Sequence, residues 1–169
     1  MDFVARLAVT WFFLSLVVVA LALLLRRAMK GPAFTVESLV GPISGLLRQG
    51  YNGGFLIISV ERSKKFLQLN KYITGPGQFG LELAFPRAPW AAEYYDSFQL
   101  WCKARNVPYR KAPSGEHDPS EFIIVDLGTD IRSAHAFVSD VLREILNAGS
   151  SRLFCRLENA TVEDRLIDS

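Results

Sequence analysis

Glycine spacing gives the first pattern in the chain that could do chemistry. The segment Gly75-Pro76-Gly77-Gln78-Phe79-Gly80 satisfies the G-x-G-x-x-G pattern of dinucleotide-binding loops. In that motif a strand precedes the glycines and a helix follows them, and the amides at the helix N-terminus hold the pyrophosphate. Here an alternating, strand-like segment follows instead, and Pro76 has no amide hydrogen to donate. The sequence therefore predicts a hairpin loop at this position.

Residues that could bind a metal or act as nucleophiles are few and scattered. His117 lies beside Glu116 and Asp118, a trio that could hold a metal weakly, but its polar and turn-rich surroundings favour a solvated loop. His135 has no second histidine at helical spacing. The candidate nucleophiles lack the sequence context that activates such groups: Ser59, Ser63, Ser97, Cys102 and Cys155. We therefore expect no catalytic, cofactor-binding or metal-binding residues, no cofactor, and no enzymatic activity.

The longest apolar stretch in the chain covers residues 7–25 and contains no charge. As a helix it would be about 28 Å long, close to the ~30 Å hydrocarbon core of a bilayer. Its leucine, valine and phenylalanine content makes insertion favourable by several kcal/mol. The sequence predicts a single N-terminal transmembrane helix that serves as the membrane anchor. Its side chains include Leu7, Trp11, Phe12, Phe13, Leu14, Val18, Leu21 and Leu25.

Two other interpretations of this stretch fit the sequence less well. A cleaved signal peptide has a shorter apolar run, followed by a small-x-small cleavage site. Here the only A-x-A, Ala20-Leu21-Ala22, lies inside the run and is followed by three leucines. A buried helix of a soluble core would normally show a polar side, and this stretch has none. An uncleaved anchor is the better interpretation.

Positive charge after the anchor predicts its orientation. Arg26, Arg27 and Lys30 follow the apolar stretch, whereas Asp2 and Arg6 nearly cancel before it. Because an excess of lysine and arginine marks the cytoplasmic side, the rest of the chain should face the cytoplasm, or the matrix of an organelle. We therefore expect an integral, single-pass membrane protein in which residues 1–30 form the anchor and its basic flank.

The charge balance of the remaining chain argues against nucleic acid as a partner. The whole chain carries a formal net charge of +2. Residues 1–30 contribute +3 of this, so residues 31–169 carry a net charge of −1. Nucleic-acid modules show a basic face or stripe, and no such clustering is present. We expect one domain in residues 31–149 and a C-terminal tail in residues 150–169.

Periodicity predicts an α+β domain of element order α-β-β-β-α-β-β-α with an antiparallel sheet. Thr35 is a plausible N-cap of the first helix, which is either kinked at Gly41-Pro42 or restarts with Pro42 as the first residue of a second helix. Alternating residues in the tail could add one more strand or dock on a partner. The predicted strands are 55–60, 66–73, 79–85, 107–112 and 121–127, and the later helices are 90–105 and 129–147.

The element order and two local patterns resemble the type III secretion chaperone-like domains, including the YbjN-type ones. The first pattern is Lys65-Phe66-Leu67-Gln68-Leu69 leading to Leu81-Glu82-Leu83. The second is a helix that ends in ARNVP (residues 104–108), then a loop, the strand FIIV (122–125) and a final helix rich in alanine and valine. The likeness spans residues 34–147. It implies a small protein-binding module, often dimeric, without catalysis; the membrane anchor is a departure from the pattern.

Together these features lead to two functional hypotheses. The first is a membrane-tethered, non-catalytic protein-binding module, similar to a chaperone or adaptor, in contact with the lipid bilayer and a protein partner or a second copy of itself. Its candidate contact surface is the sheet side that carries Phe66, Gln68 and Tyr72, with the first helix; these side chains could instead be covered by the other two helices. The alternative function is a permanent accessory subunit of a larger membrane complex. A third hypothesis, a membrane-bound hydrolase or nucleotide enzyme, is discarded because no motif in this sequence supports it.

Overall fold

The computed structural model describes residues 32–49, 52–113 and 121–158. The chain divides into two compact units, Met1–Pro32 and Ala33–Ser169. The predicted anchor, its basic flank and the loop that contains His117 lie outside the described residues. Within the described ranges, no helix is both long and apolar enough to cross a membrane. The second unit is described below by itself.

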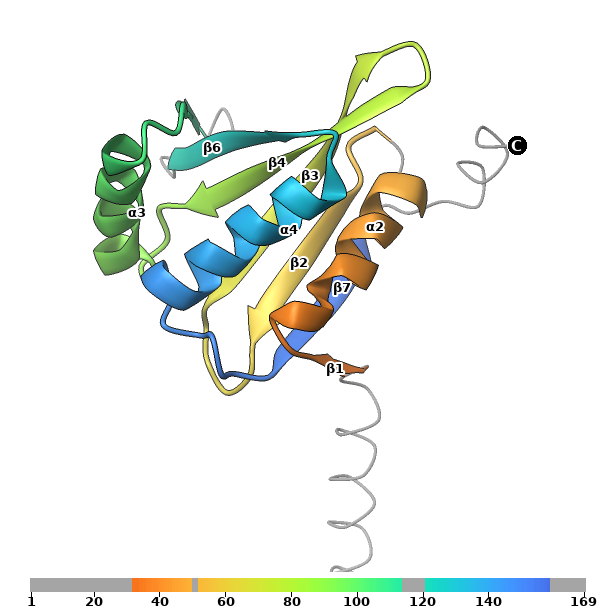
Figure 1. Cartoon of the computed structure of the whole chain (residues 1–169). Coiled ribbons are helices and arrows are strands. Elements are labelled where there is room, and N and C mark those ends of the chain that lie inside the picture. The colour runs from red at the N-terminus through yellow and green to blue at the C-terminus, as the bar shows by residue number, and fades with distance from the viewer. Residues whose placement is uncertain (1–31, 50–51, 114–120, 159–169) are drawn as a thin grey trace, which may run out of the picture. The chain divides into compact units, whose positions relative to one another are not determined.

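Seven antiparallel strands of this unit form one sheet in the order β1-β7-β2-β3-β4-β6-β5 (Figure 1). The strands are β1 (Ala33–Phe34), β2 (Phe55–Val60), β3 (Phe66–Gly75), β4 (Gln78–Pro86), β5 (Arg110–Pro113), β6 (Glu121–Gly128) and β7 (Leu153–Glu158). The helices are α2 (Val40–Gln49), α3 (Ala92–Ala104) and α4 (Ile131–Asp140). A 3₁₀ turn (Glu37–Leu39) precedes α2, and a π-helical turn (Val141–Ile145) continues α4. The expected α+β class and antiparallel sheet are confirmed.

Two strands were not part of the predicted order. β7 lies in the segment that we assigned to a separate tail, and it pairs with β2 from Leu153↔Val60 to Glu158↔Phe55. Leu153 is buried in the core, and Cys155 and Leu157 on the same side of the strand pack against it. Of the two alternatives for this segment, an added strand is therefore observed through Glu158. β1 is only two residues long, too short to give a periodic signal, and it pairs with the outer edge of β7.

The first helix begins differently from the prediction at Thr35. Its N-cap residue is Val36, which makes no side-chain cap, and the Ser38 hydroxyl instead bonds both the amide and the carbonyl of Thr35. A 3₁₀ turn leads directly into α2, and Pro42 is the third residue of α2. In the first turn of an α-helix an amide hydrogen has no partner within the helix, so proline is tolerated there. The predicted restart with Pro42 as the first residue of a helix is therefore not observed, because α2 begins two residues earlier.

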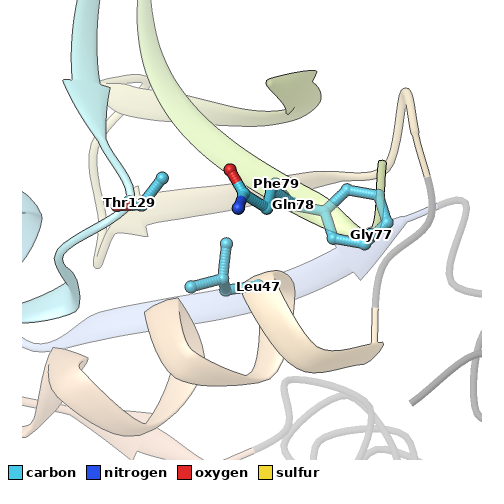
Figure 2. Close-up of a pocket in the computed structure, with 5 residues that line it drawn as sticks. All are labelled: Leu47, Gly77, Gln78, Phe79 and Thr129. Atoms are coloured by element: carbon cyan, nitrogen blue, oxygen red, sulfur yellow. The ribbon is translucent and has the colours of Figure 1, made fainter. Parts of the chain in front are cut away.

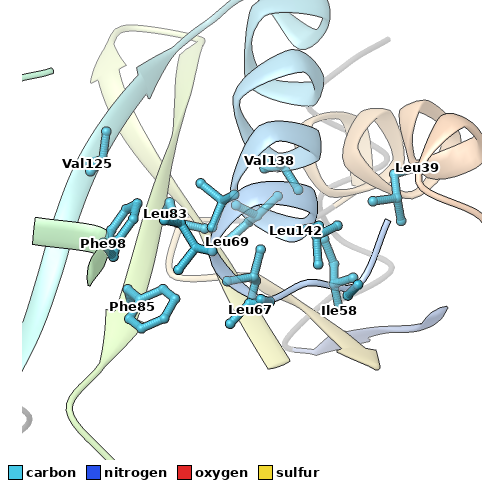
Figure 3. Packing of buried hydrophobic residues seen from close by; sticks show 14 of the residues in the cluster. Leu39, Ile58, Leu67, Leu69, Leu83, Phe85, Phe98, Val125, Val138 and Leu142 are labelled. Carbon is cyan, nitrogen blue, oxygen red and sulfur yellow. The ribbon is translucent and has the colours of Figure 1, made fainter. Parts of the chain in front are cut away.

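The hydrophobic core lies between the sheet and a layer of helices. Leu67 and Leu69 on β3 point into it, as do Leu83 and Phe85 on β4, and all four are fully buried (Figure 3). α4 crosses the middle of the sheet and α2 lies over the β2 and β7 side (Figure 1). α3 joins the same layer, because its Trp101 packs edge-on against Phe137 of α4 with ring centroids 5.3 Å apart. Core residues from the helices include Leu39, Ile43, Leu46, Tyr95, Phe98, Cys102, Ala134, Val138 and Leu142.

Candidate functional site

One face of the sheet is opposite the helices, and we call it the open face. On β3 the residues alternate: those facing the helices are buried, whereas Phe66, Gln68, Asn70 and Tyr72 are half-buried on the other side. The register extends this face to β2, where Phe55, Ile57 and Ser59 pair with Asn70, Gln68 and Phe66. It also places Glu82 of β4 beside Asn70, and Asp126 of β6 beside Glu82.

A connected series of polar side chains crosses the centre of the open face. The Gln68 amide donates to Asn70 Oδ1 at 2.8 Å, and the Asn70 amide donates to Glu82 Oε1 at 3.2 Å. Arg110 reaches the other Glu82 oxygen from β5, with Nη2 2.9 Å from Oε2. These bonds link β3, β4 and β5, so their side chains are oriented before any partner arrives. Aromatic and aliphatic side chains of β2 and β3 flank this series, which gives the face a mixed apolar and polar surface.

Tyr72 lies at one end of the open face and is held in place from two sides. Its hydroxyl donates to Asp126 Oδ1 at 2.6 Å, and the same oxygen accepts the Gly128 amide at 2.8 Å. The ring covers Gly80: a Cβ at that position would lie 2.7 Å from Cζ of Tyr72. Glycine at position 80 is therefore required for the present position of the Tyr72 ring.

Because of Tyr72 and Tyr95, we expect the folded domain to lose stability at alkaline pH. The pKa of Tyr72 is raised to about 12, mainly by its hydrogen bond to Asp126. The pKa of Tyr95 is also raised, first by burial and then by its hydrogen bond to Glu121. In the unfolded chain both phenols ionise near pH 10. Their stabilising contribution is therefore complete below about pH 10 and is lost as the pH rises through the folded pKa values. Urea midpoints measured between about pH 8 and about pH 11 should fall, and less steeply for Tyr72→Phe. Equal slopes for the two proteins would contradict this role of Tyr72.

The predicted contact residues Phe66, Gln68 and Tyr72 all lie on the open face, but part of the prediction is wrong. Residues Ile43 and Leu46 of α2 belong to the core on the opposite side of the sheet, so the first helix cannot share a surface with them. The described helices α3 and α4 do not cover these side chains either, because they pack on the other face. Phe66 is partly covered at the end of its strand by the ring of Trp90, with centroids 5.1 Å apart.

A small pocket lies beside the β3–β4 hairpin, and Figure 2 shows the residues that line it. Its volume is about 390 Å³, and its lining comes from the end of α2, the β3–β4 hairpin and the loop before α4. The lining residues are Leu47, Gly77, Gln78, Phe79 and Thr129. None of these five side chains titrates, so the lining itself supplies no general acid or base. The hairpin contains the G-x-G-x-x-G segment as the sequence predicted: Gly75 ends β3, Gly77 lies in the turn, and Gly80 lies within β4.

The chemistry-bearing residues in the described part of the chain are in structural positions. Cys102 is buried on α3, and desolvation raises the pKa of its thiol to about 11; burial raises that of Cys155 to about 12. Both thiols therefore stay protonated, and unreactive, near neutral pH. His135 Nε2 lies 2.9 Å from the Val36 carbonyl oxygen and links α4 to the first turn. No cluster of three potential metal ligands occurs within the ranges that the structure describes.

The polar partners on other strands were not found from the sequence. Glu82, Arg110 and Asp126 come from β4, from the edge strand β5 and from β6, and only the pairing register brings them to the side of the sheet that carries Asn70 and Tyr72. The available signal was the alternation of Glu82 with Leu81 and Leu83 on β4, which placed it on the opposite side of that strand from these leucines. The partner strand and register are not encoded in that alternation.

Comparisons with known proteins add no family to this picture. The chain matches no family model, and no curated protein or solved structure shows significant similarity to it.

Proposed function

We propose that this protein is a membrane-tethered, non-catalytic module that binds another protein through the open face of its sheet. The observation that carries the proposal is the row Phe66, Gln68 and Tyr72 along β3, on the side of the sheet away from the described helices. Two of these side chains are held by hydrogen bonds, Gln68 to Asn70 on the same strand and Tyr72 to Asp126 of β6. A contact surface that is ordered in advance loses less conformational entropy on binding.

The apolar stretch 7–25 supports the membrane part of the proposal. Tethering to a bilayer raises the effective concentration of a partner in the same membrane, so contacts of modest affinity suffice. The resemblance of residues 34–147 to type III secretion chaperone-like domains points in the same direction, because such domains bind proteins without catalysis. The tether favours a client or assembly partner that is itself at the membrane.

Photo-crosslinking of the full chain in native membranes tests this proposal. A photoreactive amino acid at position 68 should give a defined crosslinked product, whereas the same group at position 100, on the helix side and 66% exposed, should not. The product should be lost when Tyr72→Ala is added, because this change removes the ring and the hydroxyl that bonds Asp126. The matched control is Ser97→Ala on the solvent side of α3, which should leave the product unchanged.

The nature of the crosslinked product decides between forms of the proposal. A product between two copies of the chain identifies a homodimer, and a different protein that leaves in mild detergent identifies a client. A partner that stays in a fixed ratio through purification identifies the chain as an accessory subunit. A full chain that is monodisperse and gives no product at position 68 would contradict binding through this face.

A further inference from the structure

Three exposed basic side chains lie together at one end of the sheet. Arg62 and Lys64 are in the turn between β2 and β3, and Arg152 immediately precedes β7. None of the three takes part in an ion pair with any described residue. We call these three residues the basic end.

Backbone hydrogen bonds hold the two segments of the basic end together. The Glu61 amide donates to the Arg152 carbonyl at 2.9 Å, which fixes the turn against the start of β7. Within the turn, the Ser63 amide donates to the Val60 carbonyl, and the Lys65 amide donates to the Ser63 hydroxyl. Arg62 has a φ of 57°, the left-handed conformation of a tight turn. These hydrogen bonds join the backbone segments that carry the three cations.

Two other basic side chains at this end already have partners within the protein. The Lys65 ammonium donates to the Leu146 carbonyl at 2.9 Å, and Arg143 pairs with Glu37 at the same distance. Glu61, which is half-buried, is the acidic side chain within the β2–β3 turn. The three unpaired cations thus outnumber the acidic groups of their own segments.

The basic end is also where the chain enters this unit. Ala33 of β1 pairs with Phe154, two residues after Arg152. Seven residues, 26–32, connect the apolar stretch to Ala33, and fully extended they reach about 25 Å. They include Arg26, Arg27 and Lys30, which carry the same sign of charge. With the proposed tether, this connection would limit the distance of Ala33 from the membrane to about 25 Å.

We propose that the basic end binds the headgroups of anionic phospholipids and so orients the domain on the membrane surface. This inference rests on the proposed membrane tether. An anionic surface attracts each lysine or arginine enough to change affinity roughly fivefold, so three residues together supply roughly a hundredfold. The attraction falls off within about 8 Å at physiological salt, so it acts only when this end faces the lipid.

The test uses the full chain in nanodiscs of phosphatidylcholine, with or without phosphatidylglycerol, and measures hydrogen exchange in segments 61–65 and 147–152. Exchange should slow by about fivefold or more with phosphatidylglycerol, and the effect should disappear in high salt. The variant R62N/K64Q/R152Q should lose it; asparagine is chosen at position 62 because it tolerates a positive φ. The control R48Q/K103Q/R132Q removes three exposed basic residues elsewhere and should keep it.

The inference would be overturned by no slowing with phosphatidylglycerol, or by slowing that R62N/K64Q/R152Q keeps. Equal slowing on pure phosphatidylcholine, equal loss in the control variant, or the same slowing by inorganic phosphate on phosphatidylcholine discs would overturn it as well. Failure of the membrane tether is recognised separately, because the chain would then not stay in either disc. Failure of the proposed protein binding through the open face is also recognised separately. It would appear as a missing crosslinked product at position 68 and not as a change in the hydrogen exchange of the two segments.

Discussion

The double substitution Leu14→Arg and Val18→Arg is expected to move the full chain from the membrane fraction to the soluble fraction. The two positions are four residues apart, so on a helix both arginines lie on the same face. Each arginine near the centre of a transmembrane helix costs about 2.5–3.5 kcal/mol, and each replaced apolar residue loses a further few tenths. The total of about 6–8 kcal/mol is comparable with the whole insertion free energy of the stretch. Fractionation after an alkaline wash of the membranes measures the effect.

The matched control places the same two charges on the surface of the second unit. Val40→Arg and Leu100→Arg change residues that are 41% and 66% exposed, and they should leave the chain in the membrane fraction. A wild-type chain that is already soluble and shortened at its N-terminus would contradict the anchor and support a cleaved signal peptide. Membrane retention of the Leu14→Arg and Val18→Arg protein would equally contradict it.

Phe85→Ala is expected to reduce the free energy of unfolding by about 3–5 kcal/mol, a large part of the stability of a small domain. Phe85 is fully buried on β4, at the junction between the sheet and α3. Its ring stacks on Phe98 with centroids 4.8 Å apart and lies 6.4 Å from that of Trp90. Alanine would leave a cavity bordered by these rings, which strands and helix hold too firmly to collapse fully. Urea denaturation of the full chain in mild detergent measures the loss.

Leu100→Ala is the control for this cavity. Leu100 lies on the solvent side of the helix that carries Phe98, and substitutions at such sites change stability by less than about 0.5 kcal/mol. Similar losses for Phe85→Ala and Leu100→Ala would contradict the assignment of Phe85 to the core.

The regular parts of the fold could be predicted because their periodicity is local. β4 alternates through Leu81, Leu83 and Phe85, and β6 is an apolar run that is buried from Ile123 to Val125. The start of α4 was predicted at residue 129, and in the structure Asp130 is the N-cap and accepts the Arg132 amide. In each case the pattern within about ten residues decided the element.

The site was harder to predict because it depends on pairing between distant segments. Phe66, Gln68 and Tyr72 were recognised as one side of a strand, but the sequence did not show which side the helices would cover. Side-chain alternation separates the two faces of a strand. When both faces carry apolar residues, it does not show which face packs on the helices. Gly80 is a similar case, because a side chain at this position would collide with the ring of Tyr72 on the neighbouring strand.

The position of β7 between β1 and β2 has a consequence for how the chain is made. Leu56 pairs with Leu157, about a hundred residues later, so β2 acquires its second neighbour only after nearly the whole domain has been synthesised. Until then the edge of an apolar strand, FLIISV, exposes unpaired backbone groups that can pair with other chains. Such distant pairings also form slowly. Biogenesis therefore has a vulnerable interval, which should be sensitive to chaperone supply and to truncation before Leu153.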